Sequence, residues 1–109
     1  MYVQIIEFEL LGMTAAEYEA FCEKGVPMIA QAPGVLGKLF LTDSESNRRG
    51  AVYTFTDREA AEAYVGGELF QTAIAGNPAI TNVRVRGSEV LEGPTRALDR
   101  ELTSVAEPH

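Results

Sequence analysis

The chain has 109 residues, 46% of them hydrophobic, and its 16 acidic and 9 basic side chains give a net charge of -7. This length and composition predict one globular domain and exclude tandem domains. The acidic balance argues against nucleic acid and anionic membranes as partners, because both require clusters of basic side chains. No apolar run is long enough to span a membrane and no basic segment precedes the first apolar run, so a cytoplasmic protein is expected.

The histidine and cysteine content excludes several kinds of catalytic site. His109, at the end of a polar tail, is the only histidine, and Cys22 is the only cysteine. Serine and cysteine triads that need a histidine base are therefore not expected, and neither are metal sites built on histidine pairs. We predict no metal site.

The first predicted strand covers residues 2–10, where apolar residues alternate with other residues. Ile6 and Phe8 fall on one face of this strand, and Glu7 falls on the other with Ile5. The strand should therefore have one face that packs in the core and a second face of mixed character.

A helix is predicted after this strand. Thr14 and Glu17 have the spacing of a capping box, in which the two side chains satisfy backbone donors at a helix start. An apolar stripe at three- and four-residue steps continues to Gln31, and Pro27 should bend or divide the helix.

Two further strands are predicted over 35–42 and 51–56, joined by a polar hairpin connection over 43–50. Alternation in the first of these strands places Leu36, Lys38 and Phe40 on one face. We expect Leu36 and Phe40 to lie on the sheet face that the helices leave uncovered.

The last elements repeat the same order. Thr56 and Glu59 have capping-box spacing for a second helix, which is interrupted at Gly66 and Gly67. A short helical turn over 68–75 follows, and alternation from Val83 predicts a fourth strand.

The order strand, helix, strand, strand, helix, strand predicts an α+β fold, a ferredoxin-like βαββαβ sandwich with an antiparallel sheet and both helices on one face. The domain should cover residues 1–96, and residues 97–109 should form a polar, flexible tail. Exposing the uncovered apolar face is unfavourable, so we expect a homodimer in which two sheets pack together as a dimeric α+β barrel. Each protomer would then have a pocket between its sheet and its second helix.

Four stretches of the chain resemble the YdhR-type monooxygenase family, which belongs to the dimeric α+β barrel superfamily of antibiotic-biosynthesis monooxygenases. They are MYVQIIEF at 1–8, PGV at 33–35, VYTFTDREA at 52–60 and AYVGGELF at 63–70. The likeness covers about residues 1–96 and is most specific at the second helix. It implies a cofactor-independent oxidation of an aromatic, quinol-type small molecule, similar to a polyketide, by molecular oxygen.

The resemblance also relates individual positions to those of characterised relatives. In haem-degrading relatives a tryptophan on the second helix is followed ten residues later by a histidine, and the matching positions here are Tyr64 and Ile74. Haem ligation is therefore not expected. Polyketide-oxidising relatives have a tyrosine where this chain has Phe70, and an arginine about where it has Arg84.

The resulting hypothesis gives catalytic roles to Glu7, Arg84 and Tyr64. Glu7 would take a phenolic proton, Arg84 would stabilise the anion, and Tyr64 would position the ring through its hydroxyl. The predicted substrate-binding residues are Phe40, Phe70 and Ile74.

Each of these residues also has a structural interpretation. Tyr64, Phe40 and Phe70 suit an ordinary core, and Arg84 could pair with a glutamate across the sheet. Two other functions stay open, an isomerase or cyclase that transfers protons without oxygen, and a non-catalytic ligand-binding or stress-associated module. Oxygen uptake and product analysis would separate the three.

Overall fold

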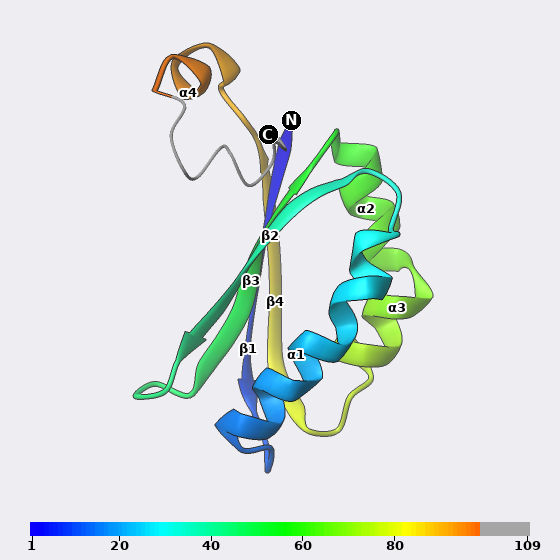
Figure 1. Cartoon of the computed structure of the whole chain (residues 1–109), viewed down its shortest axis with the longest axis vertical. Helices are drawn as coiled ribbons and strands as arrows, with labels where there is room; N and C mark the ends of the chain where they lie inside the picture. The colour runs from blue at the N-terminus through cyan, green and yellow to red at the C-terminus, as the bar shows by residue number, and fades with distance from the viewer. Residues whose placement is uncertain (99–109) are drawn as a thin grey trace.

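The computed structural model describes residues 1–98, which form a four-stranded antiparallel sheet with helices packed on one face (Figure 1). The strands are β1 (Tyr2–Leu10), β2 (Val35–Asp43), β3 (Arg48–Phe55) and β4 (Ile80–Glu89), in the spatial order β2-β3-β1-β4. The helices on the sheet are α1 (Ala15–Ala30), α2 (Arg58–Gly66) and α3 (Glu68–Phe70), the last continued by a π-helical turn, Gln71–Ala75. The ferredoxin-like α+β fold is confirmed.

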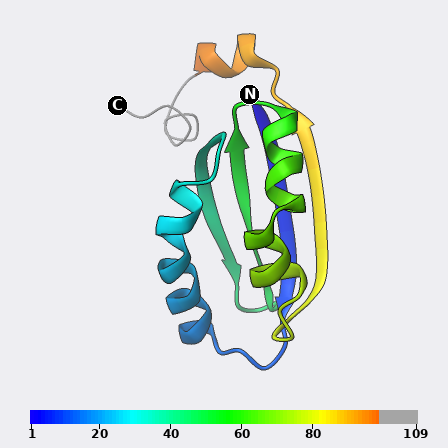
Figure 2. The same cartoon turned by 90° about the vertical axis from the view of Figure 1, so that its right-hand side faces the viewer.

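Strand β1 lies at the centre of the sheet and pairs with both β3 and β4. Every second residue from Tyr2 to Leu10 is buried, and the residues between them are half-buried on the other face. The buried set packs under the helices, which cover that face only (Figure 2). The two faces of the sheet therefore have different surroundings, and we call them the covered face and the open face.

Helix α1 begins as predicted and continues past its proline. Thr14 Oγ1 accepts a hydrogen bond from the Glu17 amide at 3.1 Å, and the Glu17 carboxylate accepts from the Thr14 amide at 2.9 Å. The helix is one continuous element from Ala15 to Ala30 although Pro27 lies inside it. Ile29 packs against the core beyond the proline, and that burial keeps the last turn in place.

Strand β2 contains a bulge that changes which residues face the helices. Val35 pairs with Phe55 but Gly37 pairs with Thr54, so Leu36 is an extra residue in the strand. The bulge places Lys38 and Phe40 on the covered face, beside Tyr53 and Ala51. The prediction that Phe40 lies on the uncovered face is wrong, because strict alternation does not continue through a bulge.

Two predicted boundaries also differ from the structure. Strand β3 begins at Arg48, so the hairpin connection is shorter than predicted and turns through Asn47 at a φ of 60°. The cap of α2 is Asp57, whose carboxylate accepts from the Ala60 amide at 2.8 Å. The capping box predicted for Thr56 and Glu59 does not form, because the Thr56 amide that Glu59 would accept from donates to the Gly34 carbonyl at 2.9 Å.

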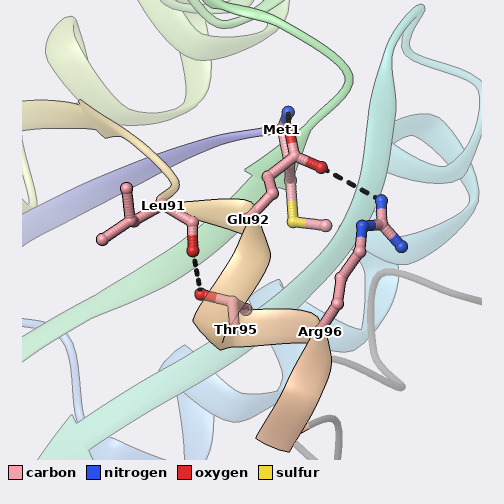
Figure 3. A network of polar contacts seen from close by, with 5 residues as sticks. All are labelled: Met1, Leu91, Glu92, Thr95 and Arg96. Carbon is pink, nitrogen blue, oxygen red and sulfur yellow. Dashed lines mark hydrogen bonds and ion pairs between the residues drawn. The ribbon is translucent and has the colours of Figure 1, made fainter.

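A last helix, α4 (Glu92–Leu98), follows β4 and lies next to the N-terminus (Figure 3). The Met1 ammonium group lies 2.8 Å from one carboxylate oxygen of Glu92, and Arg96 lies 3.1 Å from the other. The predicted domain end at residue 96 falls inside this helix, and most of the predicted tail lies outside the described residues. Every helix within residues 1–98 is too short or too polar to cross a membrane.

Candidate functional site

A cavity of about 150 Å³ lies between the covered face of the sheet and the helices. This volume is enough for one aromatic ring, and because the cavity is partly open to solvent, a further fused ring of a ligand can extend beyond it. The helical elements contribute twelve residues to its wall and the strands contribute seven, and most of these residues are apolar. The lining residues are Ile6, Phe8, Tyr18, Phe21, Cys22, Lys24, Gly25, Met28, Ile29, Lys38, Phe40, Gly50, Ala51, Tyr53, Tyr64, Leu69, Phe70, Ala73 and Ile74.

Four of the six residues singled out from the sequence line this cavity. Tyr64 comes from α2, Phe70 from α3, Ile74 from the π-helical turn and Phe40 from β2. The rings of Tyr64 and Phe70 have centroids 6.4 Å apart. The structure therefore brings these four side chains to one site.

The hydroxyl groups of Tyr53 and Tyr64 lie 2.9 Å apart and are hydrogen-bonded to each other. Burial raises the pKa of both hydroxyls, so both keep their protons at neutral pH. Each hydroxyl carries one hydrogen and only one is used between them. The pair therefore retains one O–H that can donate to a ligand oxygen.

Aromatic packing holds this hydroxyl pair in place. Phe55, which is fully buried, stacks on Tyr53 with ring centroids 5.6 Å apart and an interplanar angle of 17°. The Tyr64 ring lies 5.0 Å from Tyr53 and 5.6 Å from Phe55. Tyr53 and Tyr64 line the cavity, and Phe55 packs against both rings without lining it.

Lys38 places an ammonium group in this aromatic site. Its Nζ lies 4.1 Å from the centre of the Phe40 ring and 4.5 Å from that of Tyr53. Desolvation lowers the pKa of Lys38 to about 8. Alternation placed Lys38 on the same strand face as Leu36 and Phe40, which we expected to be uncovered, so the sequence predicted no role for it.

Glu7 and Arg84 lie on the open face and are not brought to the cavity. Glu7 alternates with the buried residues of β1, and Arg84 is its partner in the register of β4. Paired residues of an antiparallel ladder point to the same side of the sheet. Across the part of the chain that the structure describes, no ion pair joins these two side chains.

The remaining polar groups around the cavity stay in their protonated forms. Burial raises the pKa of the Cys22 thiol and that of the Tyr18 hydroxyl. Residues 1–98 contain no group of three or more histidine, cysteine, aspartate or glutamate side chains placed to bind a metal ion. The site can therefore bind a small aromatic molecule. The tyrosine hydroxyls and the Lys38 ammonium group can donate hydrogen bonds to that molecule.

One protein family matches the chain over nearly all of its length. The family described as "Putative mono-oxygenase ydhR" matches residues 3–100. The chain belongs to this family. Comparison with curated proteins gave no match.

Solved structures share the fold at low sequence identity. A mutant of SnoaB, a cofactor-independent oxygenase from Streptomyces nogalater, is 17% identical with a TM-score of 0.66, covering 84% of this chain and 93% of its own. MhuD, a haem degrader from Mycobacterium tuberculosis seen with two haems in its active site, is 24% identical with a TM-score of 0.66, covering 84% and 96%. A protein described as a putative antibiotic biosynthesis monooxygenase from Deinococcus radiodurans is 14% identical with a TM-score of 0.70, covering 85% and 95%. At these identities the likeness shows the fold.

Proposed function

We propose that this protein is a cofactor-independent monooxygenase that oxidises an electron-rich, quinol-type aromatic molecule with molecular oxygen. The observation that carries the proposal is the aromatic cavity with its hydrogen-bonded Tyr53 and Tyr64 hydroxyls. Membership of a monooxygenase family supports the reaction class. The fold shared with SnoaB, itself described as a cofactor-independent oxygenase, is consistent with a reaction that uses the substrate as electron donor.

The residues of the cavity have separable roles in this proposal. Phe40, Phe70 and Ile74 hold the ring by apolar contact and exclude water from it. The free hydrogen of the tyrosine pair donates to an oxygen of the substrate, where negative charge develops when the substrate releases its proton to water, before it gives an electron to oxygen. In the complete reaction a ring-flanked CH2 group becomes a carbonyl, one atom of O2 enters the product, and the other leaves as water.

The proposal includes a homodimer formed through the open face. This face carries half-buried aliphatic side chains from three strands, and Leu41 at its edge is 41% exposed. A second copy packed sheet to sheet would remove Ile5, Leu39 and Val52 from water, at roughly 25 cal/mol for each Å² of apolar surface. Glu7 and Arg84 would then belong to the interface between the copies.

The test follows oxygen consumption by the purified protein with a panel of anthrone- and naphthol-type quinols, using 18O2 to trace the oxygen atoms. We expect one labelled oxygen in the product and one in water. Tyr64→Phe should lower the rate by roughly tenfold or more, because a hydrogen-bond donor to the developing anion is lost. Protein-independent uptake, or uptake unchanged in Tyr64→Phe and in Phe70→Ala, would contradict the proposal.

Two open-face variants serve as the matched comparison. Glu7→Gln and Arg84→Ala test whether the chemistry lies at the face between two copies rather than in the cavity. A rate lost in these variants and kept in Tyr64→Phe would move the active site to the open face. Conversion of a substrate without oxygen uptake would instead support an isomerase or cyclase, and binding without any product would support a binding module.

A further inference from the structure

Two lysines line the cavity, and the proposed reaction does not yet use either of them. Lys24 is exposed, whereas Lys38 is partly buried. Lys38 Nζ lies over the rings of Phe40 and Tyr53, and the surrounding wall is largely apolar. A lysine ammonium carries three hydrogen-bond donors, and in the described part of the chain no hydrogen bond or ion pair occupies those of Lys38. The group is therefore desolvated without a counter-ion.

The elements packed around Lys38 contain no carboxylate that faces it in the cavity. The titratable and charged groups on that side are Tyr18, Cys22 and Lys24 of α1, Arg49 and Tyr53 of β3, and Tyr64 of α2. Glu19 and Glu23 influence Cys22 through their charges, but neither forms an ion pair with Lys38. Arg49 lies outside the cavity wall, and its Nη1 donates to the carbonyl oxygens of Asp43 and Arg48, at 2.9 and 3.1 Å, while its buried Nε has no hydrogen-bond partner among the described residues.

A partly buried charge is stabilised by a partner of opposite sign, and the rings beside Lys38 offset only part of the cost of its desolvation. A ligand that brings a negative oxygen into the cavity would supply the missing partner. The apolar wall would meanwhile contact the aromatic part of the same ligand. A charged oxygen on an aromatic ring satisfies both requirements.

We propose that the cavity selects aromatic ligands in their anionic form, with the charged oxygen of the ligand paired with Nζ of Lys38. This inference rests on the proposed function and narrows its substrate class to aromatic molecules with an ionisable hydroxyl group, such as phenols and enols. Lys38 would hold such a substrate as its phenolate or enolate. That is the form that gives up an electron to oxygen most readily.

The proposal has a consequence for pH. Without ligand, Lys38 loses its proton near pH 8. Burial raises the pKa of the Cys22 thiol and of the Tyr53 and Tyr64 hydroxyls, so these groups keep their protons at that pH. Affinity for a ligand that stays ionised should therefore be highest below pH 8. It should fall by about tenfold for each pH unit above that value, because the lysine must first be protonated.

The experiment compares 2-naphthoate with 2-naphthamide, which have the same ring system and differ in charge, by isothermal titration calorimetry of the intact protein. Neither compound is oxidised by this route, so the measurement reports binding alone. At pH 7 the naphthoate should bind at least tenfold more tightly than the amide. At pH 9.5 that preference should be largely lost.

Four variants, at Lys38, Lys24 and Arg86, test which positive charge causes the preference for naphthoate. Lys38→Met should abolish the preference for naphthoate, Lys38→Arg should retain most of it, and Arg86→Met, which removes one positive charge from the open face, should leave it unchanged. Circular dichroism of each variant establishes that it is folded. Equal affinity for the two compounds, no binding of either at millimolar concentration, or a preference lost in Lys24→Met but kept in Lys38→Met would overturn the proposal.

These experiments test anion selection by Lys38 separately from the monooxygenase reaction. A preference for naphthoate that depends on Lys38, without oxygen uptake on any quinol, would support anion selection and contradict the monooxygenase assignment. Oxygen uptake that Lys38→Met leaves unchanged, with equal binding of the two naphthalene compounds, would do the reverse.

Discussion

The covered and open faces of the sheet are made by the same strands, yet they differ in chemistry. The covered face carries Phe8, Tyr53 and Phe55, which pack on one another and on α1 and α2. The open face carries aliphatic side chains together with Glu7 and Arg84. The groups that we predicted to work together are therefore separated by the thickness of one sheet, because neighbouring residues in a strand point to opposite sides.

Because of this difference, the aromatic rings and the charges of the sheet are expected to have separate roles. The rings on the covered face form a cavity with hydroxyl and ammonium groups at its wall. The charges on the open face lie among aliphatic side chains, on the face that we propose as an interface between copies. The following predictions test that distinction.

The largest expected effect is on the covered face. Phe55→Ala should lower the free energy of unfolding by about 3–5 kcal/mol, because the ring is fully buried and its loss leaves a cavity. Val52→Ala, three residues earlier on the open face, should cost only about 1 kcal/mol in the monomer. Urea unfolding followed by circular dichroism measures both. Equal losses would mean that the two faces are equally buried, and a Val52→Ala loss that grows with protein concentration would identify the open face as an interface.

The next effect concerns the close approach of β3 to β1. Gly50 has a φ of +156°, and a side chain there would collide with the Ile6 carbonyl oxygen and approach Glu7 Cα. Gly50→Ala should therefore cost on the order of 2–3 kcal/mol. Gly66→Ala is the matched control, because nothing lies within 4 Å of the added carbon. The same thermal unfolding temperature for both variants would be inconsistent with this packing.

A smaller effect depends on pH. Desolvation lowers the pKa of Lys38 from 10.5 to about 8, so the folded state disfavours the charged lysine. Between pH 8 and pH 10.5 the unfolded chain binds more protons at this residue, and its contribution to stability rises with pH. Lys38→Met should be more stable than the wild type at pH 7 by about 1 kcal/mol, allowing for partial exposure, and the difference should shrink by pH 9. A constant difference across this range would show that Lys38 is well solvated.

The smallest effect is at the start of α1, in the helical layer that distinguishes the covered face. Thr14→Ala should cost about 1 kcal/mol, because the capping hydrogen bond to Glu17 is lost. Thr72→Ala, at an exposed position, should be nearly neutral. Hydrogen bonds from Thr14 lower the pKa of Glu17, and that contribution is present above pH 4.5 and lost as the pH falls. The Thr14 amide makes the larger contribution and remains in Thr14→Ala, so the difference between this variant and wild type should narrow only in part at pH 3.

Much of the fold could be predicted from local patterns. Alternation from Tyr2 to Leu10 predicted β1 with its boundaries, and the spacing of Thr14 and Glu17 predicted the start of α1. The start of α2 was missed by one residue, because a strand-end hydrogen bond from Thr56 to Gly34 competes with the cap. Such competition between distant segments has no local signature.

The candidate site could be predicted only in part. Tyr64, Phe70 and Ile74 were predicted from the family resemblance along α2 and the turns after it, and the structure places all three in the cavity. Lys38 was missed and Phe40 was placed on the wrong face for one reason, the extra residue at Leu36. A bulge moves every later side chain of its strand to the other face, and its position depends on how β2 pairs with β3.

By itself, the sequence determined the order of the elements, the exclusion of histidine chemistry, and the family resemblance. Those properties depend on residue identity and on spacing over a few positions. The tertiary structure alone decided that Lys38 meets Tyr53 and Tyr64 in one cavity, and that Glu7 and Arg84 lie behind it. Strand register and helix docking make those choices, because they are set by packing between residues far apart in the chain.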